Sequence, residues 1–305
     1  MKLSSERLGL IVLIAGAAII GLSPIFVRLS DAGPSATGFW RLAFAAPLLA
    51  ILTAIERPPA AARTTNRFAF TPLMLLAGAL FAADLASWHY GIHFTSVANA
   101  TVLSNGTPIL VTAAAWLLLR ERPQRMFAMG MSLAIGGAVV MALAQAAPTT
   151  RHGAGSAPLL GDALSLSTAV WYGGYFLAVR ELRKTASASA VMFWSSVAGL
   201  PLLILAAMLL REPFTPATAL GWEACVGLGL VHVSGQGAIA WALGRVPTAL
   251  ASVVVLVQPV VAAALGWLIF GEVITPLQGL GAALALAGVA VAQMSAKTPP
   301  LPPEP

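Results

Sequence analysis

The sequence predicts an all-α integral membrane protein of ten transmembrane helices, arranged as two inverted five-helix repeats. Composition is the first observation behind this prediction. Of the 305 residues, 58% are hydrophobic and only 9% are charged, whereas a soluble domain carries roughly 25% charged residues. The second is run length, because the apolar runs extend over about twenty residues, twice the length of a membrane-barrel strand. The third is that the second half of the chain repeats the first.

The apolar runs follow one another along the chain, and short polar loops separate them. We expect the spans at residues 8–27, 36–55, 70–92, 98–119, 126–146, 159–179, 190–210, 221–243, 249–270 and 277–294. The first run follows Lys2 and Arg7, as the core of a signal peptide would. It is long for such a core, and no A-x-A-like cleavage site follows, so we interpret it as a retained span.

The basic residues indicate the orientation of these spans. With the N-terminus in the cytoplasm, thirteen of the 17 Lys and Arg residues face inward, as the positive-inside rule describes. We therefore predict a bacterial inner-membrane protein with both termini in the cytoplasm. The formal net charge of +6 arises largely from short loops, and no basic stripe with interleaved aromatic residues is present. We expect no nucleic-acid partner.

An internal repeat aligns residues 98–140 with 249–291 without a gap. The least common matches are Pro108, Trp116, Glu121, Gly130 and Gly137 with Pro259, Trp267, Glu272, Gly281 and Gly288. We expect the four glycines to permit close helix packing. A repeated pair also occurs earlier in each half, where Phe39-Trp40 recurs as Phe193-Trp194.

Five spans in each repeat would place the second repeat upside down relative to the first, because five is odd. The loops agree: RERPQR at 120–125 carries three arginines, and its equivalent GEVITP at 271–276 carries none. The expected organisation is a first repeat at 1–147, an outward linker at 148–157, a second repeat at 158–295 and a disordered cytoplasmic tail at 296–305. Inverted repeats around a midplane site are typical of transporters.

Two stretches carry a resemblance to a known family. "NGTPILVTAAAWLLLRERP" with "GMSLAIGGAVVM", and "VQPVVAAALGWLIFGEVITPLQGLGAALALAGVAV", resemble the repeat end of the drug/metabolite transporter superfamily, EamA family. "GPSATGFWRLAFAAPLL" resembles its second span, with an arginine at Arg41. Within the superfamily the chain is most similar to the YddG-type amino acid exporters. The resemblance implies a transporter with two EamA repeats, and it favours a structural role for Arg41.

Ionisable residues inside the expected spans are functional candidates, because a charge in the bilayer is costly. Arg41 and Asp84 lie at similar depths when counted along their helices at about 1.5 Å per residue. They could form a structural ion pair between the second and third spans. The equally weighted alternative is a role in handling substrate or protons.

Further polar and aromatic residues are expected deep in the bundle. The candidate substrate-binding residues, in addition to Asp84, are Trp88, His89, Asn105, Trp171, Tyr172, His232 and Gln236. Aromatic rings could offer an apolar surface to a substrate side chain, and amides could bind its polar groups. The alternatives are interfacial anchoring for tryptophan and hydrogen bonding between helices for the polar side chains.

These features favour a secondary transporter that exports amino acids, aromatic or neutral, or related small metabolites by alternating access. An exporter of hydrophobic cations or drugs is the alternative, and an intramembrane enzyme or a non-transporting scaffold is less favoured. The sequence shows no HExxH, GxSxG or Walker A motif and holds one cysteine, Cys225. We therefore expect no enzyme activity, metal, cofactor or ATP drive. The expected partners are the lipid bilayer and a small-molecule substrate.

Overall fold

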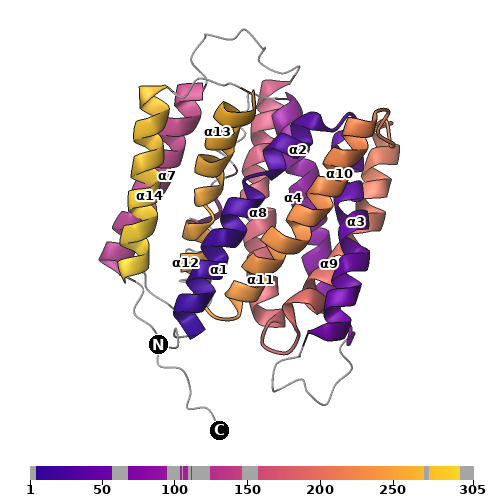
Figure 1. The fold of residues 1–305 in the computed structure, drawn as a ribbon, viewed down its shortest axis with the longest axis horizontal. Helices are drawn as coiled ribbons and strands as arrows, with labels where there is room; N and C mark the ends of the chain where they lie inside the picture. Colours follow the sequence, from indigo (N-terminus) through magenta and orange to yellow (C-terminus); the bar gives the residue numbers. More distant parts are fainter. Residues whose placement is uncertain are drawn as a thin grey trace.

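The computed structural model of the protein describes residues 5–56, 68–94, 104, 106–108, 111, 124–145, 157–270 and 275–295. Every regular element within these ranges is helical, as expected (Figure 1). The elements are α1 (Ser5–Ile20), α2 (Ser23–Leu29), α3 (Pro34–Ile55), α4 (Pro72–Phe94), α7 (Arg125–Gln145), α8 (Pro158–Leu182), α9 (Ala188–Leu209), α10 (Ala219–Val231), η2 (His232–Gln236), α11 (Gly237–Leu243), α12 (Thr248–Val254), α13 (Val257–Phe270) and α14 (Pro276–Ser295).

Several of these helices are long enough to span a membrane. Six stretches of the described residues are long and apolar enough to cross a membrane: Ser5–Leu29, Pro34–Ile55, Pro72–Gly91, Ala188–Leu209, Ala219–Leu243 and Thr248–Ile269. The expected spans that lie in the described ranges coincide with helices to within three residues at each end. The expected span 98–119 lies largely outside the described residues, so the count of ten stays a prediction.

Proline and short polar side chains mark the helix starts. Proline is the first residue of α3, α4, α8 and α14, where its missing N–H group costs nothing and its fixed φ suits the helix. Ser187 caps α9 by accepting a hydrogen bond from the Ala190 N–H at 3.2 Å. Thr218 caps α10 in the same way, with the Gly221 N–H at 3.0 Å. These local signals explain why the helix ends were predictable.

Among the described residues, three of the expected spans are interrupted. The first divides into α1 and α2 at Gly21, ahead of Pro24, and the ninth divides into α12 and α13 ahead of Pro259. The eighth contains the π-helical segment η2 between α10 and α11. π-Helical segments are rare overall. Where they do occur, they are often at functional sites, because they reorient the side chains of one turn.

Helices α3 and α9 run antiparallel and cap each other. Glu56 follows α3, and its carboxylate accepts hydrogen bonds from the Ala188 and Ser189 N–H groups at the start of α9, at 3.4 and 3.0 Å. Glu212 follows α9, and its carboxylate accepts a hydrogen bond from the Ala36 N–H in the first turn of α3 at 3.0 Å. Each carboxylate satisfies free N–H groups and offsets the helix dipole at the end of the other helix.

A second pair of matched contacts involves the tryptophans that the sequence repeat equates. The Trp40 indole in α3 donates a hydrogen bond to the Phe214 carbonyl, after α9, at 2.8 Å. The Trp194 indole in α9 donates to the Phe68 carbonyl, after α3, at 3.1 Å. Corresponding helices of the two halves therefore make the same contacts in opposite directions.

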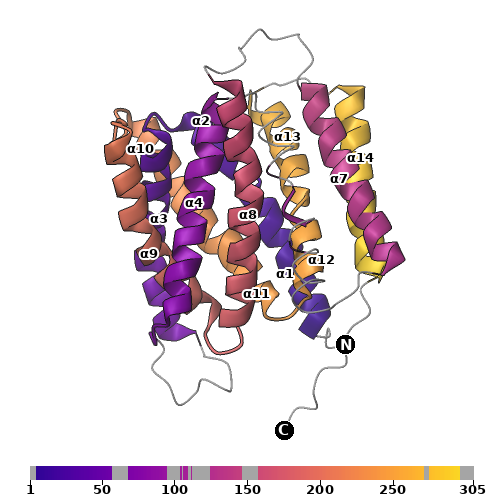
Figure 2. The ribbon, with the colours of Figure 1, turned by 180° about the vertical axis from the view of Figure 1, so that it is seen from behind.

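Helices α7 and α14 lie side by side at one edge of the bundle in both views (Figures 1 and 2). A Cβ built on Gly130 would lie 2.8 Å from the Gly288 carbonyl oxygen, and one on Gly137 would lie 2.5 Å from that of Gly281. Only glycine allows so close an approach. The expectation that these glycines permit close packing is confirmed, and their order shows that the two helices are antiparallel.

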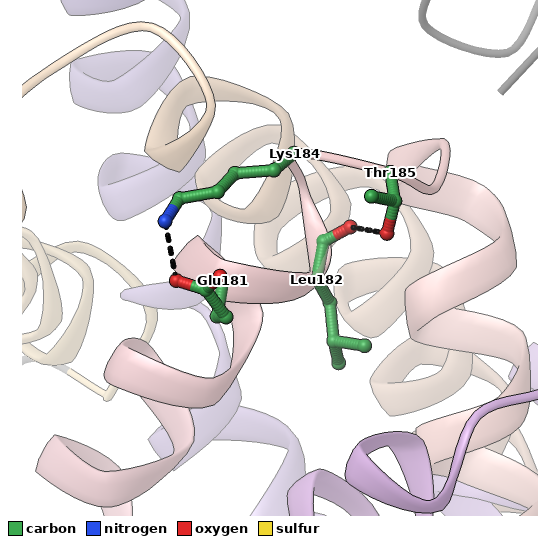
Figure 3. A network of polar contacts seen from close by, with 4 residues as sticks. All are labelled: Glu181, Leu182, Lys184 and Thr185. Atoms are coloured by element: carbon green, nitrogen blue, oxygen red, sulfur yellow. Dashed lines mark hydrogen bonds and ion pairs between the residues drawn. The ribbon is translucent and has the colours of Figure 1, made fainter. Parts of the chain in front are cut away.

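Helix α1 begins and α14 ends at the same end of the bundle (Figure 1), which is also where α8 ends and α9 begins. The end of α8 and the connection to α9 carry charged residues. Lys184 Nζ lies 2.6 Å from the exposed Glu181 carboxylate, and Figure 3 draws this ion pair. Arg183 is instead only 8% exposed and donates a hydrogen bond to the Ala186 carbonyl. Burial lowers the pKa of its guanidinium to about 10, while the negative charge of Glu56 acts to raise it. Arg183 therefore stays charged at neutral pH.

Candidate functional site

The centre of the candidate site is Phe81, in α4, whose ring is surrounded by groups from other helices. The ring centroid lies 4.8 Å from that of Tyr175 in α8 and 5.1 Å from that of His232 in η2. The Arg41 guanidinium, from α3, stands 5.9 Å from the same centroid. Arg41 is only 4% exposed and His232 only 1%, so this polar cluster lies within the bundle.

The π-helical segment supplies its first and last residues to this cluster. His232 Nε2 is hydrogen-bonded to the Ser196 hydroxyl in α9 at 3.1 Å. The Gln236 side chain lies with both of its polar atoms 3.3 Å from the Tyr172 hydroxyl in α8. These side chains are polar, largely buried and held by partners on neighbouring helices, which is the condition for a rigid polar site inside a membrane.

Aromatic rings form one side of the cluster. The Tyr172 ring is stacked against Tyr175 at 6.0 Å between centroids and lies 4.8 Å from Phe176. The Tyr175 hydroxyl donates to the Met192 sulfur at 3.1 Å. Tyr172 is the less buried of the two tyrosines.

Two groups that can carry opposite charges, Arg41 and Asp84, lie in the same region without pairing. Asp84 is one turn beyond Phe81 on α4 and is close enough to attract the Arg41 guanidinium electrostatically. Among the described residues, however, neither Arg41 nor Asp84 makes a hydrogen bond or an ion pair within 4.0 Å. The structural ion pair that the sequence allowed is therefore not formed in this structure.

Two buried nitrogens of the cluster, Arg41 Nε and His232 Nδ1, have no hydrogen-bond partner among the described residues. Buried polar atoms are nearly always hydrogen-bonded, so two unpartnered nitrogens in one cluster are unusual. Both belong to side chains that contact Phe81, so they gather in one place.

The other predicted residues that the structure describes make contacts outside this cluster. Trp88 is half-buried, and among the described residues its ring contacts that of His89 at 5.3 Å between centroids. His89 is buried, and its Nδ1 is hydrogen-bonded to the Pro34 carbonyl at the start of α3 at 2.7 Å. The Trp171 indole donates to Ser167 on its own helix at 3.1 Å. Within the described part of the chain, no hydrogen bond or ring contact joins these three residues to the cluster, and Asn105 lies outside that part.

Sequence reasoning did not single out Ser196, which is the hydrogen-bond partner of His232. A single serine in an apolar helix is a weak signal, because most such serines bond to their own helix. It also missed the capping roles of Glu56 and Glu212. The signal for these was present, since each glutamate closely follows the second span of its repeat. Within the described residues, no group of three or more His, Cys, Asp or Glu side chains is placed to bind a metal.

Comparison with known families decides the class. Residues 7–143 and 159–294 both match the EamA-like transporter family. The chain belongs to this family. The two matches confirm that the chain is a duplication, and this EamA protein is accordingly a membrane transporter. Residues 89–200 also match solute carrier family 35.

Relatives of this EamA protein are named as transporters. It is 27% identical over 225 residues to the uncharacterized transporter YwfM of Bacillus subtilis, covering 72% of each chain. It is 26% identical over 288 residues to an uncharacterized transporter of Archaeoglobus fulgidus, covering 94% of this chain and 96% of the other. It is 22% identical to the pseudopaline exporter CntI of Pseudomonas aeruginosa, and the match covers 66% of this chain and 68% of the other.

A solved crystal structure matches the fold with a TM-score of 0.76 at 19% identity. The match covers 96% of this chain and 98% of the other. At this identity the likeness concerns the fold alone. It shows that the arrangement of helices in Figures 1 and 2 occurs in an experimentally determined protein.

Proposed function

We propose that this EamA protein is a secondary transporter that exports amino acids, or related small metabolites, by alternating access. The cluster around Phe81 is its substrate site. The observation that carries the proposal is that this buried site is built from both halves of the chain. Arg41 and Phe81 come from the first half, and Tyr172, His232 and Gln236 come from the second. A relative movement of the halves would open such a site to one side at a time.

The surroundings of the site support a small substrate with both apolar and polar parts. Tyr172, Tyr175 and Phe176 offer aromatic surface, while Gln236 and His232 offer groups that hydrogen-bond. An amino acid has the matching combination of a side chain and polar ends. The relative CntI is named as a pseudopaline exporter, which fits the proposed direction of transport.

Counterflow in proteoliposomes tests this function. Vesicles loaded with one unlabelled amino acid should accumulate the same labelled amino acid when they contain the protein, and protein-free vesicles should not. The panel should include tryptophan, phenylalanine, leucine, threonine and a hydrophobic cationic dye. Accumulation of the dye alone would favour the alternative function, an exporter of hydrophobic cations. Accumulation of nothing in the panel would contradict the proposal.

We further propose that the protein crosses the bacterial inner membrane ten times, with five spans in each of two inverted halves and both termini in the cytoplasm. The reciprocal capping of α3 and α9 and the antiparallel pairing of α7 and α14 support the inversion. The placement of the α1 start and the α14 end at one end of the bundle supports an even number of spans (Figure 1).

Cysteine labelling tests this topology. Single cysteines at Arg122 and Thr275, introduced with Cys225→Ala, occupy equivalent loops of the two repeats. In intact cells, a membrane-impermeant maleimide should label the cysteine at Thr275 and should label the one at Arg122 only after the membrane is permeabilised. The control is the unmodified protein, whose buried Cys225 should not react with the maleimide in intact or in permeabilised cells. Labelling of both introduced cysteines from the outside would contradict the inversion.

A further inference from the structure

We propose that Arg41 and Asp84 bind the two charged ends of a zwitterionic substrate, Arg41 its carboxylate and Asp84 its ammonium group. The inference rests on the proposed function and narrows it, because it requires the substrate to carry both charges. It also gives Arg41 a binding role in place of the structural role that the family resemblance favoured.

The first step in the argument is the cost of the two charges. Arg41 is 4% exposed and Asp84 is half-buried in a membrane-spanning helix, where unpaired charges are rare. A direct ion pair would relieve part of this cost. Instead, both side chains are without a hydrogen-bonded or ion-paired partner among the described residues. Two opposite charges kept apart are complementary to a molecule that carries the opposite charge at each end.

The second step is the geometry around Phe81. The Arg41 guanidinium stands 5.9 Å from the Phe81 ring, and Asp84 follows Phe81 by three residues on the same face of α4. The guanidinium therefore stands near the ring, and Asp84 lies about one turn further along the same helix face. A small zwitterion that covers this ring could reach both groups, with its carboxylate at the guanidinium and its ammonium group at the carboxylate.

The third step is His232, which supplies a second donor for the carboxylate. Its ring lies 5.1 Å from Phe81, and its Nδ1 is buried without a partner. When the Ser196 hydroxyl donates to Nε2, the neutral ring carries its proton on Nδ1 and can donate it. Arg41 Nε is the other unpartnered donor. Two free donors beside the same ring form a site for an anionic group.

Charge balance explains why a zwitterion is preferred over a singly charged molecule. The site contains one cation and one anion, so it is neutral when empty and neutral again with a zwitterion bound. A simple amine would neutralise Asp84 and leave the Arg41 charge buried without compensation. A simple carboxylate would do the reverse. Either mismatch leaves an uncompensated charge, which is strongly unfavourable in a bundle core.

Direct calorimetric titration of the full chain in lipid nanodiscs tests the assignment. The three probes are L-phenylalanine, phenethylamine, which lacks the carboxylate, and 3-phenylpropanoate, which lacks the amine. A leucine series of the same design repeats the test with a smaller side chain. The wild type should bind each amino acid about tenfold or more tighter than either analogue, as expected for the loss of one charge-assisted hydrogen bond.

The variants should separate the two ends. Arg41→Gln should weaken the binding of phenylalanine by about tenfold or more without weakening the binding of phenethylamine. Asp84→Asn should weaken the binding of phenylalanine to a similar extent without weakening the binding of 3-phenylpropanoate. Arg41→Lys provides a second variant that retains the charge, in case Arg41→Gln does not fold, and it should selectively weaken the carboxylates by losing the planar donor pair. Glu181→Gln, which removes an exposed carboxylate at the bundle end (Figure 3), is the control and should bind all probes as the wild type does.

The outcomes distinguish this inference from the proposed function. Equal weakening of all three probes by Arg41→Gln and by Asp84→Asn would show structural roles and overturn the inference while leaving amino acid transport intact. Phenethylamine binding as tightly as phenylalanine to the wild type would overturn it in favour of a hydrophobic-cation site. Absence of binding of both amino acids to the wild type would overturn the proposed substrate class and the inference together.

Discussion

Gly137→Val is expected to destabilise the protein strongly, whereas Gly136→Val on the next residue is expected to leave its stability almost unchanged. A Cβ on Gly137 would lie 2.3 Å from the Ala285 backbone nitrogen in α14, and one on Gly136 meets nothing within 4 Å. The first contact is with backbone, which cannot rotate aside as a side chain can. The two helices would have to separate along their glycine-rich contact.

The expected loss at Gly137 exceeds the ~1–3 kcal/mol typical of overpacking a core, because the clash involves two backbones. The intrinsic helix propensity changes equally in both variants, so it cancels in the comparison. Thermal denaturation in detergent, followed by size-exclusion chromatography, would measure the difference in melting temperature. Gly288→Val should reproduce the loss, since its Cβ would lie 2.2 Å from the Ala134 nitrogen. Equal melting temperatures for the two neighbouring variants would contradict the packing of α7 against α14.

Tyr172→Ala is expected to reduce the transport of bulky amino acids about tenfold or more, and to affect small ones less. The substitution removes a ring that packs on Tyr175 and Phe176 and a hydroxyl that is bonded to Gln236. Tyr172→Phe is the control at the same position, because it keeps the ring and loses only the hydroxyl. It should retain the preference for bulky substrates.

Initial rates of counterflow for tryptophan, leucine and alanine would test this selectivity, with each variant normalised to the protein recovered in the vesicles. Gln236→Ala should weaken the transport of all substrates without changing their order, because it removes the polar partner of Tyr172 and leaves the ring. Unchanged rates for every substrate in Tyr172→Ala and Gln236→Ala would place the site elsewhere in the bundle.

Much of the site was predictable because helical periodicity brings residues four apart to one face. His232 and Gln236 were both candidates, lie four residues apart in the sequence, and both contribute to the cluster. Trp88 and Asp84 were also candidates and are also four apart, but among the described residues the Trp88 ring contacts His89. Periodicity defines the face of one helix. Which neighbouring helix covers that face depends on packing that no single span encodes.

Sequence by itself determined the class, the helices and the duplication of this protein. Long apolar runs can satisfy their backbone hydrogen bonds only as helices in lipid, so composition was sufficient to predict them. The repeated Phe-Trp pair and glycines were likewise visible in the chain, and α3, α7, α9 and α14 use them as matched contacts.

Only the tertiary structure decided how the polar groups combine. Depth along a helix allowed Arg41 and Asp84 to pair, yet the structure gives no ion pair between them, and the Arg41 guanidinium stands near the Phe81 ring instead. The π-helical turn that directs His232 toward Ser196 and Gln236 toward Tyr172 has no signature in the hydropathy of the span. The physical reason is that hydropathy measures transfer into lipid residue by residue. The partner of a buried polar group is instead set by the rotation and crossing of at least two helices, which form only when the bundle assembles.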